Sequence, residues 1–134
     1  MRLLHLPRCL RPTILVIALA LPVYGAAKAV EIARLQGRWD LVSVNNQPVR
    51  VGEPIFFEID GLTIRGSDGC NDFGGRVDAP SRLVMTQRGC ASYAHKLPLR
   101  PTDLIVQLKA ATLVEGRLLV PLPDGGGQAE FKRR

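Results

Sequence analysis

The residues of this 134-residue chain best suited to nucleophilic or redox chemistry are its cysteines, Cys9, Cys70 and Cys90. Cys90 lies five residues before His95, so a neighbouring base could hold its thiol as a reactive thiolate. Catalysis by such a pair also needs a third group that orients the base, and the sequence pattern supplies none. A thiol enzyme or redox protein is therefore kept only as an alternative.

The other residue types offer few candidates for catalysis or metal binding. Cys70, Cys90 and His95 would provide only three zinc ligands, without the paired spacing of zinc sites. No serine lies in the Gly-x-Ser-x-Gly context of a nucleophile elbow, and the carboxylates are scattered singly. We therefore predict that the protein is not an enzyme and has no catalytic residue, metal or cofactor.

The first 29 residues are typical of a secretory signal peptide. An apolar run over 14–21 is followed by Pro22 and by several small residues. Three basic residues precede this run: Arg2, Arg8 and Arg11. The best cleavage site is the triplet Ala27-Lys28-Ala29, before Val30. We expect residues 1–29 to be the signal peptide and residues 30–134 to form a single domain.

The same segment argues against a permanent anchor. Its apolar run is shorter than the roughly 18 residues that a membrane span needs. Cys9 precedes the run, so it cannot be a lipid-modified cysteine, and no twin arginine is present. We predict a periplasmic or secreted protein exported by the Sec route without a lipobox; the alternatives are a buried N-terminal helix and an uncleaved anchor.

The basic charge of the chain belongs largely to this signal. The chain has 18 basic and 12 acidic residues, a formal charge of +6 and a pI near 9.8. Four of the basic residues precede Val30, so 14 remain against 12 acidic ones. The only basic run left is Lys132-Arg133-Arg134, which we expect to be a frayed tail. We predict no nucleic-acid partner, no membrane span after cleavage, and a monomer.

Signal cleavage would leave two cysteines, Cys70 and Cys90. An even number of cysteines in an exported protein favours a disulfide. The bridge would close a loop of about 20 residues and contribute roughly 3 kcal/mol.

Beyond Val30 the sequence predicts short strands separated by turns. The clearest pattern is the alternation of Ile55, Phe57 and Ile59 with Phe56, Glu58 and Asp60, which is typical of a half-buried strand. The predicted strands are 38–44, 55–60, 62–65, 76–78, 82–85, 112–115, 117–122 and 128–132. The turns between them are expected at 45–48, 60–61, 79–81, 115–116 and 124–127.

One helix is predicted, from Thr102 to about Ala111. Thr102 would be its N-cap, and Asp103 would favour the positive end of the helix dipole. Its apolar face comprises Leu104, Ile105, Leu108 and Ala111. The whole is a mainly β fold: a small antiparallel curled sheet or barrel of six to eight strands, with the helix packed on it or at one end.

Segment 66–75 contains four glycines, which indicates positive φ angles or closely approaching strands. It lacks the Lys-Ser/Thr ending of a P-loop. The spacing of Asp68 and Asp72 does not match a calcium-binding EF-hand. We predict a tight turn in which the Asn71 side chain accepts hydrogen bonds from backbone amides.

Gly37-Arg38-Trp39 on the first predicted strand is similar to the Gly-x-Trp with which lipocalins begin. This similarity makes a small-ligand carrier an alternative. Trp39 itself is predicted to lie in the core.

Taken together, these motifs resemble the META domain, the family of the bacterial heat-shock protein HslJ. The resemblance covers residues 33–132 and includes an opening Leu-x-Gly-x-Trp, a Gly-Cys-Asn-x-Phe-x-Gly loop and a Thr-x-x-x-Cys block. The matching residues are Leu35, Gly37, Trp39, Gly69, Cys70, Asn71, Phe73, Gly75, Thr86 and Cys90. Two departures are the absence of the lipidation cysteine of many relatives and the prolines Pro98 and Pro101 ahead of the helix.

The resemblance implies a small antiparallel β-barrel with one helix, located in the bacterial cell envelope. It also implies a role in the stress response, through heat or drug tolerance, without an established enzymatic activity. A likeness of the family to secretin pilots implies that a lipid or peptide could be held. We therefore expect an exported, non-enzymatic protein that binds an envelope protein, lipid or peptide; the alternatives are a carrier of lipocalin or pilot type and a thiol redox protein.

Overall fold

The computed structural model describes residues 31–49, 53–90 and 97–134. The predicted signal peptide, Cys9 and His95 lie outside these ranges. The strands are β1 (Gly37–Val44), β2 (Gln47–Pro48), β3 (Ile55–Asp60), β4 (Thr63–Asp68), β5 (Asp72–Arg76), β6 (Val84–Met85), β7 (Thr112–Val114), β8 (Arg117–Pro121) and β9 (Gln128–Arg133). The helices are α1 (Pro101–Leu108) and the short 3-10 helices η1 (Ile32–Leu35), η2 (Pro80–Arg82) and η3 (Pro123–Gly125).

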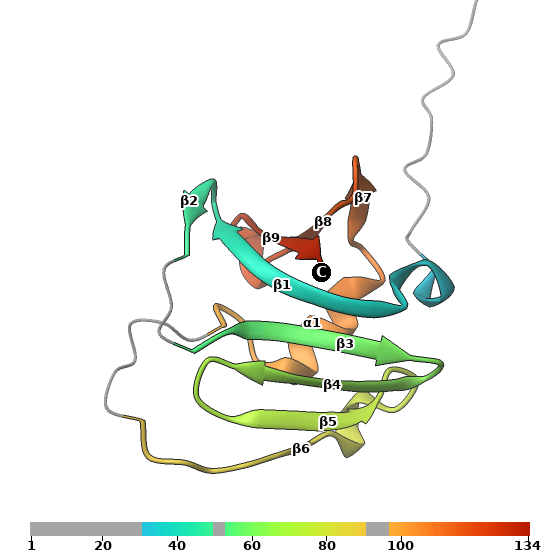
Figure 1. Cartoon of the computed structure of the whole chain (residues 1–134), viewed down its shortest axis with the longest axis vertical. Coiled ribbons are helices and arrows are strands. Elements are labelled where there is room, and N and C mark those ends of the chain that lie inside the picture. The colour runs from blue at the N-terminus through green and yellow to red at the C-terminus, as the bar shows by residue number, and fades with distance from the viewer. Residues whose placement is uncertain (1–30, 50–52, 91–96) are drawn as a thin grey trace, which may run out of the picture.

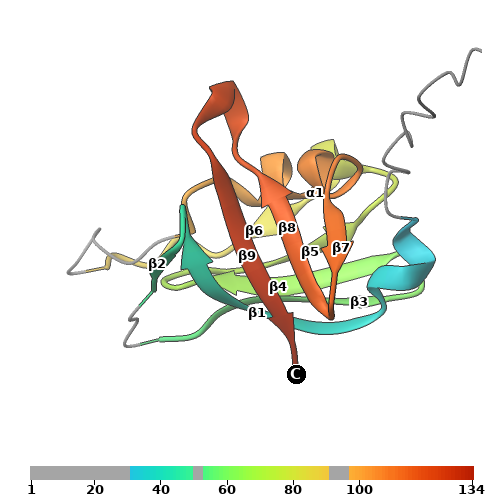
Figure 2. The same ribbon diagram turned by 90° about the horizontal axis from the view of Figure 1, so that it is seen from above.

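All nine strands belong to one antiparallel sheet, in the order β6-β5-β4-β3-β1-β9-β8-β7, with β2 paired to β1. The sheet is strongly curled, so that β7–β9 cross over the direction of β3 and β4 (Figures 1 and 2). A register shift between Leu41 and Ser43, where β1 pairs with β9, contributes to the bend. The predicted mainly β fold with a curled antiparallel sheet and one helix is confirmed.

The barrel alternative is not formed, because within the described residues the pairing ends at β6 on one side and at β7 on the other. These two edge strands have two and three residues. The sheet also contains nine strands where six to eight were expected, because Gln47–Pro48 pairs with β1 instead of remaining in a turn.

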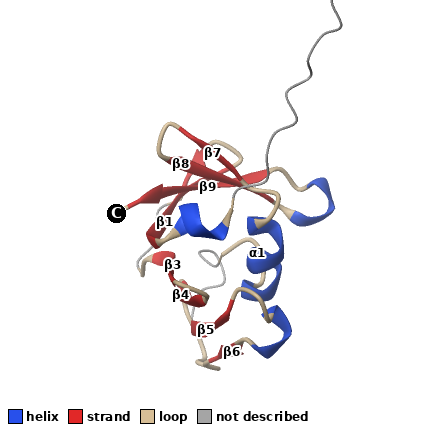
Figure 3. Ribbon diagram, turned by 90° about the vertical axis from the view of Figure 1, so that its right-hand side faces the viewer, coloured by secondary structure: helices blue, strands red, loops and turns tan. Residues whose placement is uncertain are grey.

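The helix covers the concave side of the sheet, where it contacts β8 and η2 (Figure 3). Its predicted apolar face is confirmed for Leu104, Ile105 and Leu108, which are at most 1% exposed. Ala111 is also buried but lies beyond the helix, which ends at Leu108 and not near Ala111. The predicted N-cap is wrong: the helix starts at Pro101, because proline suits the first helical position, and Arg100 is the capping residue.

Three further expectations are corrected by strand pairing. Segment 66–75 is mostly strand, since β4 extends to Asp68 and β5 starts at Asp72, leaving only a short turn between them. Residues 76–78 do not form the hairpin expected with 82–85; β6 pairs instead with Phe73 and Gly74. The basic tail is not frayed, because Lys132 and Arg133 pair with β1.

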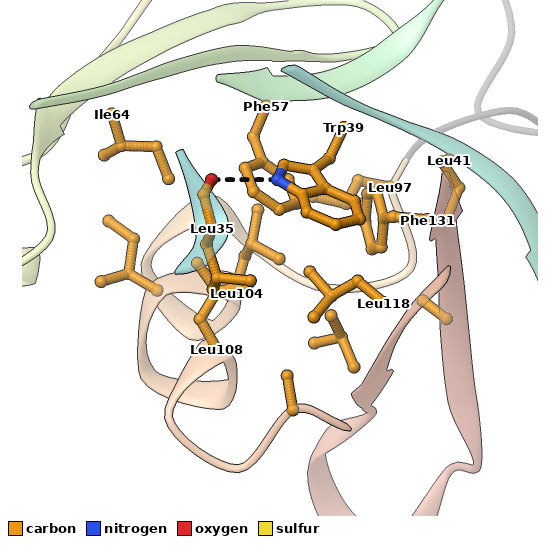
Figure 4. Close-up of a cluster of buried hydrophobic side chains, with 14 of the residues drawn as sticks. Leu35, Trp39, Leu41, Phe57, Ile64, Leu97, Leu104, Leu108, Leu118 and Phe131 are labelled. Carbon is orange, nitrogen blue, oxygen red and sulfur yellow. Dashed lines mark hydrogen bonds between the residues drawn. The ribbon is translucent and has the colours of Figure 1, made fainter. Parts of the chain in front are cut away.

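The core is centred on β1 and its two neighbours in the sheet. Trp39 is 1% exposed, and its Nε1 donates to the Leu35 carbonyl oxygen at 2.9 Å (Figure 4). Phe57 on β3 and Phe131 on β9 meet edge-on, with ring centroids 5.1 Å apart. Their contact across β1 requires the curl, because the two strands are not adjacent. Side chains therefore fill this part of the concave side.

A close approach between strands makes Gly66 necessary. A Cβ at this position would overlap the Phe56 carbonyl oxygen and lie 2.6 Å from Phe73 Cζ. We predict that Gly66→Ala lowers the unfolding free energy by about 2 kcal/mol or more. The measurement is equilibrium urea unfolding. Gly74→Ala is the matched control, because its Cβ would lie 3.7 Å from the nearest atom; equal losses for the two variants would contradict the packing.

Candidate functional site

The structure brings the turn between β4 and β5 against the segment that follows β6. Cys70 from the turn and Cys90 from this segment lie at disulfide distance, with their Cα atoms 6.0 Å apart. Both sulfur atoms lie 3.7 Å from the Arg88 carbonyl oxygen. We call this junction, made of Asp68, Cys70, Asn71, Asp72, Thr86, Arg88 and Cys90, the signature cluster.

Asp68 organises the turn. Its Oδ1 accepts the backbone amides of Cys70 at 2.9 Å and of Asn71 at 2.6 Å. The turn also needs positive φ at Gly69, which is +92°. The prediction that the Asn71 side chain accepts a hydrogen bond from a backbone amide is confirmed, but the amide is that of Arg88. The amides of the turn itself are accepted by Asp68, two and three residues ahead, in an Asx-turn.

Asn71 instead binds a segment distant in sequence. Its Oδ1 accepts the Arg88 amide at 2.6 Å and the Thr86 hydroxyl at 3.3 Å. Asn71 is buried, with 8% of its surface exposed. Its side chain takes the place of a backbone acceptor for the Arg88 amide, which lies beyond the regular pairing of β6. Asparagine suits this position because its amide carries both an acceptor and a donor.

Thr86 extends the pairing beyond the last regular residues of β6. Its backbone amide donates to the Asp72 carbonyl oxygen at 2.9 Å, and its Oγ1 accepts the Asp72 amide at 3.0 Å. Arg88 then pairs with the Asp72 carboxylate. Resemblance to the family singled out Thr86, whereas nothing in the spacing of Arg88 indicated its role.

The remaining family-motif residues serve the core. Leu35 and Trp39 are buried and hydrogen-bonded to each other, and Gly37 between them has φ of +93°. Phe73 is 4% exposed and packs in the same core. A Cβ at Gly75 would lie 3.1 Å from Leu83 Cα, so this glycine lets the chain preceding β6 approach β5.

The polar groups of the signature cluster are engaged with one another. Within the described ranges, no buried side-chain nitrogen or oxygen lacks a hydrogen-bond partner. The described residues also contain no group of three or more histidine, cysteine or acidic side chains placed to hold a metal ion. His95, the base considered for Cys90, lies outside the described residues. The cluster as described is suited to holding two segments together.

The outer face of the sheet carries a ladder of paired charges. Arg38 lies 3.6 Å from the centre of the Phe56 ring and also pairs with Asp40, while Arg65 pairs with Glu58. An open depression of about 290 Å³ lies over this ladder. The charges of this ladder lie in pairs of opposite sign, and exposed pairs of this kind contribute little to stability.

The shifted pKa values belong to two exposed ion pairs away from the cluster. The hydrogen bond from Arg76 lowers the pKa of the Asp78 carboxyl and raises the pKa of Arg76. The Asp103 carboxylate likewise raises the pKa of Arg100. These pKa shifts favour the charged forms of Arg76, Asp78 and Arg100.

No helix in the described part of the chain is long and apolar enough to cross a membrane.

The Thr86 hydroxyl is predicted to stabilise the cluster. Thr86→Val removes the acceptor of the Asp72 amide and should lower the unfolding free energy by about 1 kcal/mol. Thr86→Ser keeps the hydroxyl and should retain most of the stability. Urea unfolding of both variants measures the difference, and a valine variant as stable as the serine variant would refute the role of the hydroxyl.

We also predict that Cys70 and Cys90 are covalently bridged in protein folded under oxidising conditions. Alkylation without reductant, followed by peptide mapping, should find the two cysteine peptides joined. Cys90→Ser should lower the unfolding free energy by about 3 kcal/mol. Cys70→Ser and the double variant should lose a similar amount; recovery of both cysteines in alkylated form from folded, oxidised protein would refute the bridge.

Comparison with known proteins gives one family. The model of the META domain matches residues 31–121, from η1 to the end of β8. β9 lies beyond the match, although it pairs with both β1 and β8 in the middle of the sheet. No curated protein and no solved structure matches the chain. The match covers more than half of the chain, and the chain belongs to the META domain family.

Proposed function

We propose that this META-domain protein is exported to the bacterial cell envelope, where it supports tolerance of heat or drug stress by binding an envelope component without catalysing a reaction. The observation that carries the proposal is the signature cluster. Its Asn71 and Thr86 side chains hold the segment after β6 against the sheet, and Asp68 fixes the turn that carries Asn71. Because these side chains are engaged in hydrogen bonds within the fold, they hold this surface in one conformation. A surface that is ordered in advance binds a partner at a lower entropic cost.

The filled core favours binding on the surface over carriage of a ligand inside the sheet. Phe57, Ile64 and Leu118, which would line the interior of a lipocalin-like carrier, are each 0% exposed. Phe56 lies on the opposite face, beneath the Arg38 guanidinium. A small-molecule or lipid carrier therefore remains only as the second proposal, resting on the similarity of Gly37-Arg38-Trp39 to the start of lipocalins.

The pairing of Cys70 with Cys90 is the argument against a thiol redox function. A cysteine whose sulfur is bonded in a structural disulfide has no free thiolate and cannot act as a nucleophile. Export to an oxidising compartment and a stabilising disulfide support each other, because disulfides persist outside the cytosol.

Export is tested by fractionation of cells that produce the full chain. We expect the protein in the periplasmic or culture fraction, with an N-terminus at Val30 or within a few residues of it. A chain lacking residues 1–29 should remain in the cytoplasm and serves as the matched control. Recovery of the uncleaved full chain from the cytoplasm would refute the export proposal.

The stress role is tested by deletion and complementation. Cells without the protein should survive heat or envelope-active drugs less well, and the full chain should restore survival where the chain lacking residues 1–29 does not. Cys90→Ser, produced at a temperature at which it folds, should also restore survival. Loss of complementation by this folded variant would instead favour the thiol alternative.

A further inference from the structure

The signature cluster holds one edge of the sheet in an extended and exposed form. We call Val84–Arg88 the edge segment. It forms the free side of the sheet next to β5, at the lower margin of Figure 1. All five of its residues are exposed, and Val84 and Met85 are 71% and 44% exposed despite being apolar. An exposed edge with apolar side chains is a template for another strand.

Alternation of the backbone shows which groups face outward. The amides of Thr86 and Arg88 donate toward β5 and its turn, to the Asp72 carbonyl oxygen and to Asn71 Oδ1. Successive residues of an extended strand direct their N–H and C=O groups to opposite edges. Those of Met85 and Gln87 must therefore point away from the sheet, where they can pair with an added strand.

The edge segment is fixed before any partner arrives. Leu83 ahead of it packs on the core, and Cys90 behind it lies at disulfide distance from Cys70. Fixing a strand in advance lowers the entropic cost of pairing with it. The opposite edge, β7, is less suitable because its three residues run directly into the turn at Glu115 and Gly116.

The surroundings of the edge segment indicate the chemistry of its partner. Val84 pairs with Gly74, which has no side chain, so an open apolar depression of about 370 Å³ lies beside it. Arg82, just ahead of the edge segment, is exposed and forms no ion pair within 31–49, 53–90 and 97–134. A second copy of the chain would bring further arginines to this edge, which disfavours self-pairing.

We propose that the edge segment binds an extended segment of a partner polypeptide, which adds a strand to the sheet. The partner strand places apolar side chains beside Val84 and acidic side chains near Arg82. Main-chain hydrogen bonds to Met85 and Gln87 supply most of the affinity. This proposal rests on the proposed binding function and deepens it by naming the class of component bound.

The test uses a peptide probe and a substitution that removes one backbone N–H on the outward side of the edge segment. The probe is a fluorescent, capped seven-residue peptide of alternating valine and threonine with a glutamate at each end. Gln87→Pro removes an N–H that makes no hydrogen bond within residues 31–49, 53–90 and 97–134, and edge strands tolerate proline at such a position. Gln87→Ala keeps the N–H and is the matched control.

The full chain is purified from the cells that produce it, and binding is followed by fluorescence polarisation. We expect the natural chain and Gln87→Ala to bind the probe within twofold of each other and Gln87→Pro to bind at least tenfold more weakly. Hydrogen exchange should slow at the Met85 and Gln87 amides when the probe is bound. Urea unfolding checks that both variants are folded. If the proline variant is not folded, Gln87→Glu serves as a second variant, because its added negative charge should weaken binding of the acidic probe several fold.

Absence of probe binding, equal binding by the alanine and proline variants, or protection of β7 in place of the edge segment would each overturn the proposal. Complementation of cells that lack the protein distinguishes failure of the edge proposal from failure of the proposed envelope function. If folded Gln87→Pro restores stress survival fully, the edge segment is not the functional surface, but the envelope role stands. If deletion of the protein leaves survival unchanged while the probe binds at the edge segment, the stress role fails and the edge proposal stands.

Discussion

Burial of Trp39 on β1 is the constraint on which the rest of the structure depends. β1 is the only strand paired with both β3 and β9, so it joins the two halves of the described sheet. Trp39 fills the concave side at this junction, and its indole N–H donates a hydrogen bond to the Leu35 carbonyl oxygen. The edge-on contact of Phe57 with Phe131 is possible only because the sheet bends at this point. The two halves of the sheet therefore meet around Trp39 and its neighbours in the core.

A second, polar constraint acts where regular pairing ends. β6 has only two residues, and such a short strand has little stability of its own. Asn71 and Thr86 supply side-chain hydrogen bonds in place of missing ladder bonds, and Cys70 and Cys90 lie close enough to tie the ends covalently. In this account, the motif residues Cys70, Asn71, Thr86 and Cys90 maintain the shape of one edge of the sheet.

Much of the fold was predictable from local patterns. The alternation in Ile55–Asp60 and the helical spacing of Leu104, Ile105 and Leu108 were read correctly, because burial on one face imposes a period on the sequence. The part of the candidate site that follows from residue identity was also accessible, namely Cys70, Cys90 and the need for glycine near them. The roles of Asp68 and Arg88 were not, since both are common surface residues whose partners are set by folding.

The sequence by itself determined the class of fold, the apolar faces, most turns and the family, because these depend on local propensity and on short motifs. Only the tertiary structure decided that the described strands form an open sheet, that Lys132 and Arg133 belong to a central strand, and that Asn71 reaches Arg88. The physical reason is that strand partners and side-chain acceptors lie far apart along the chain. Their pairing is set by how the whole sheet curls around its core.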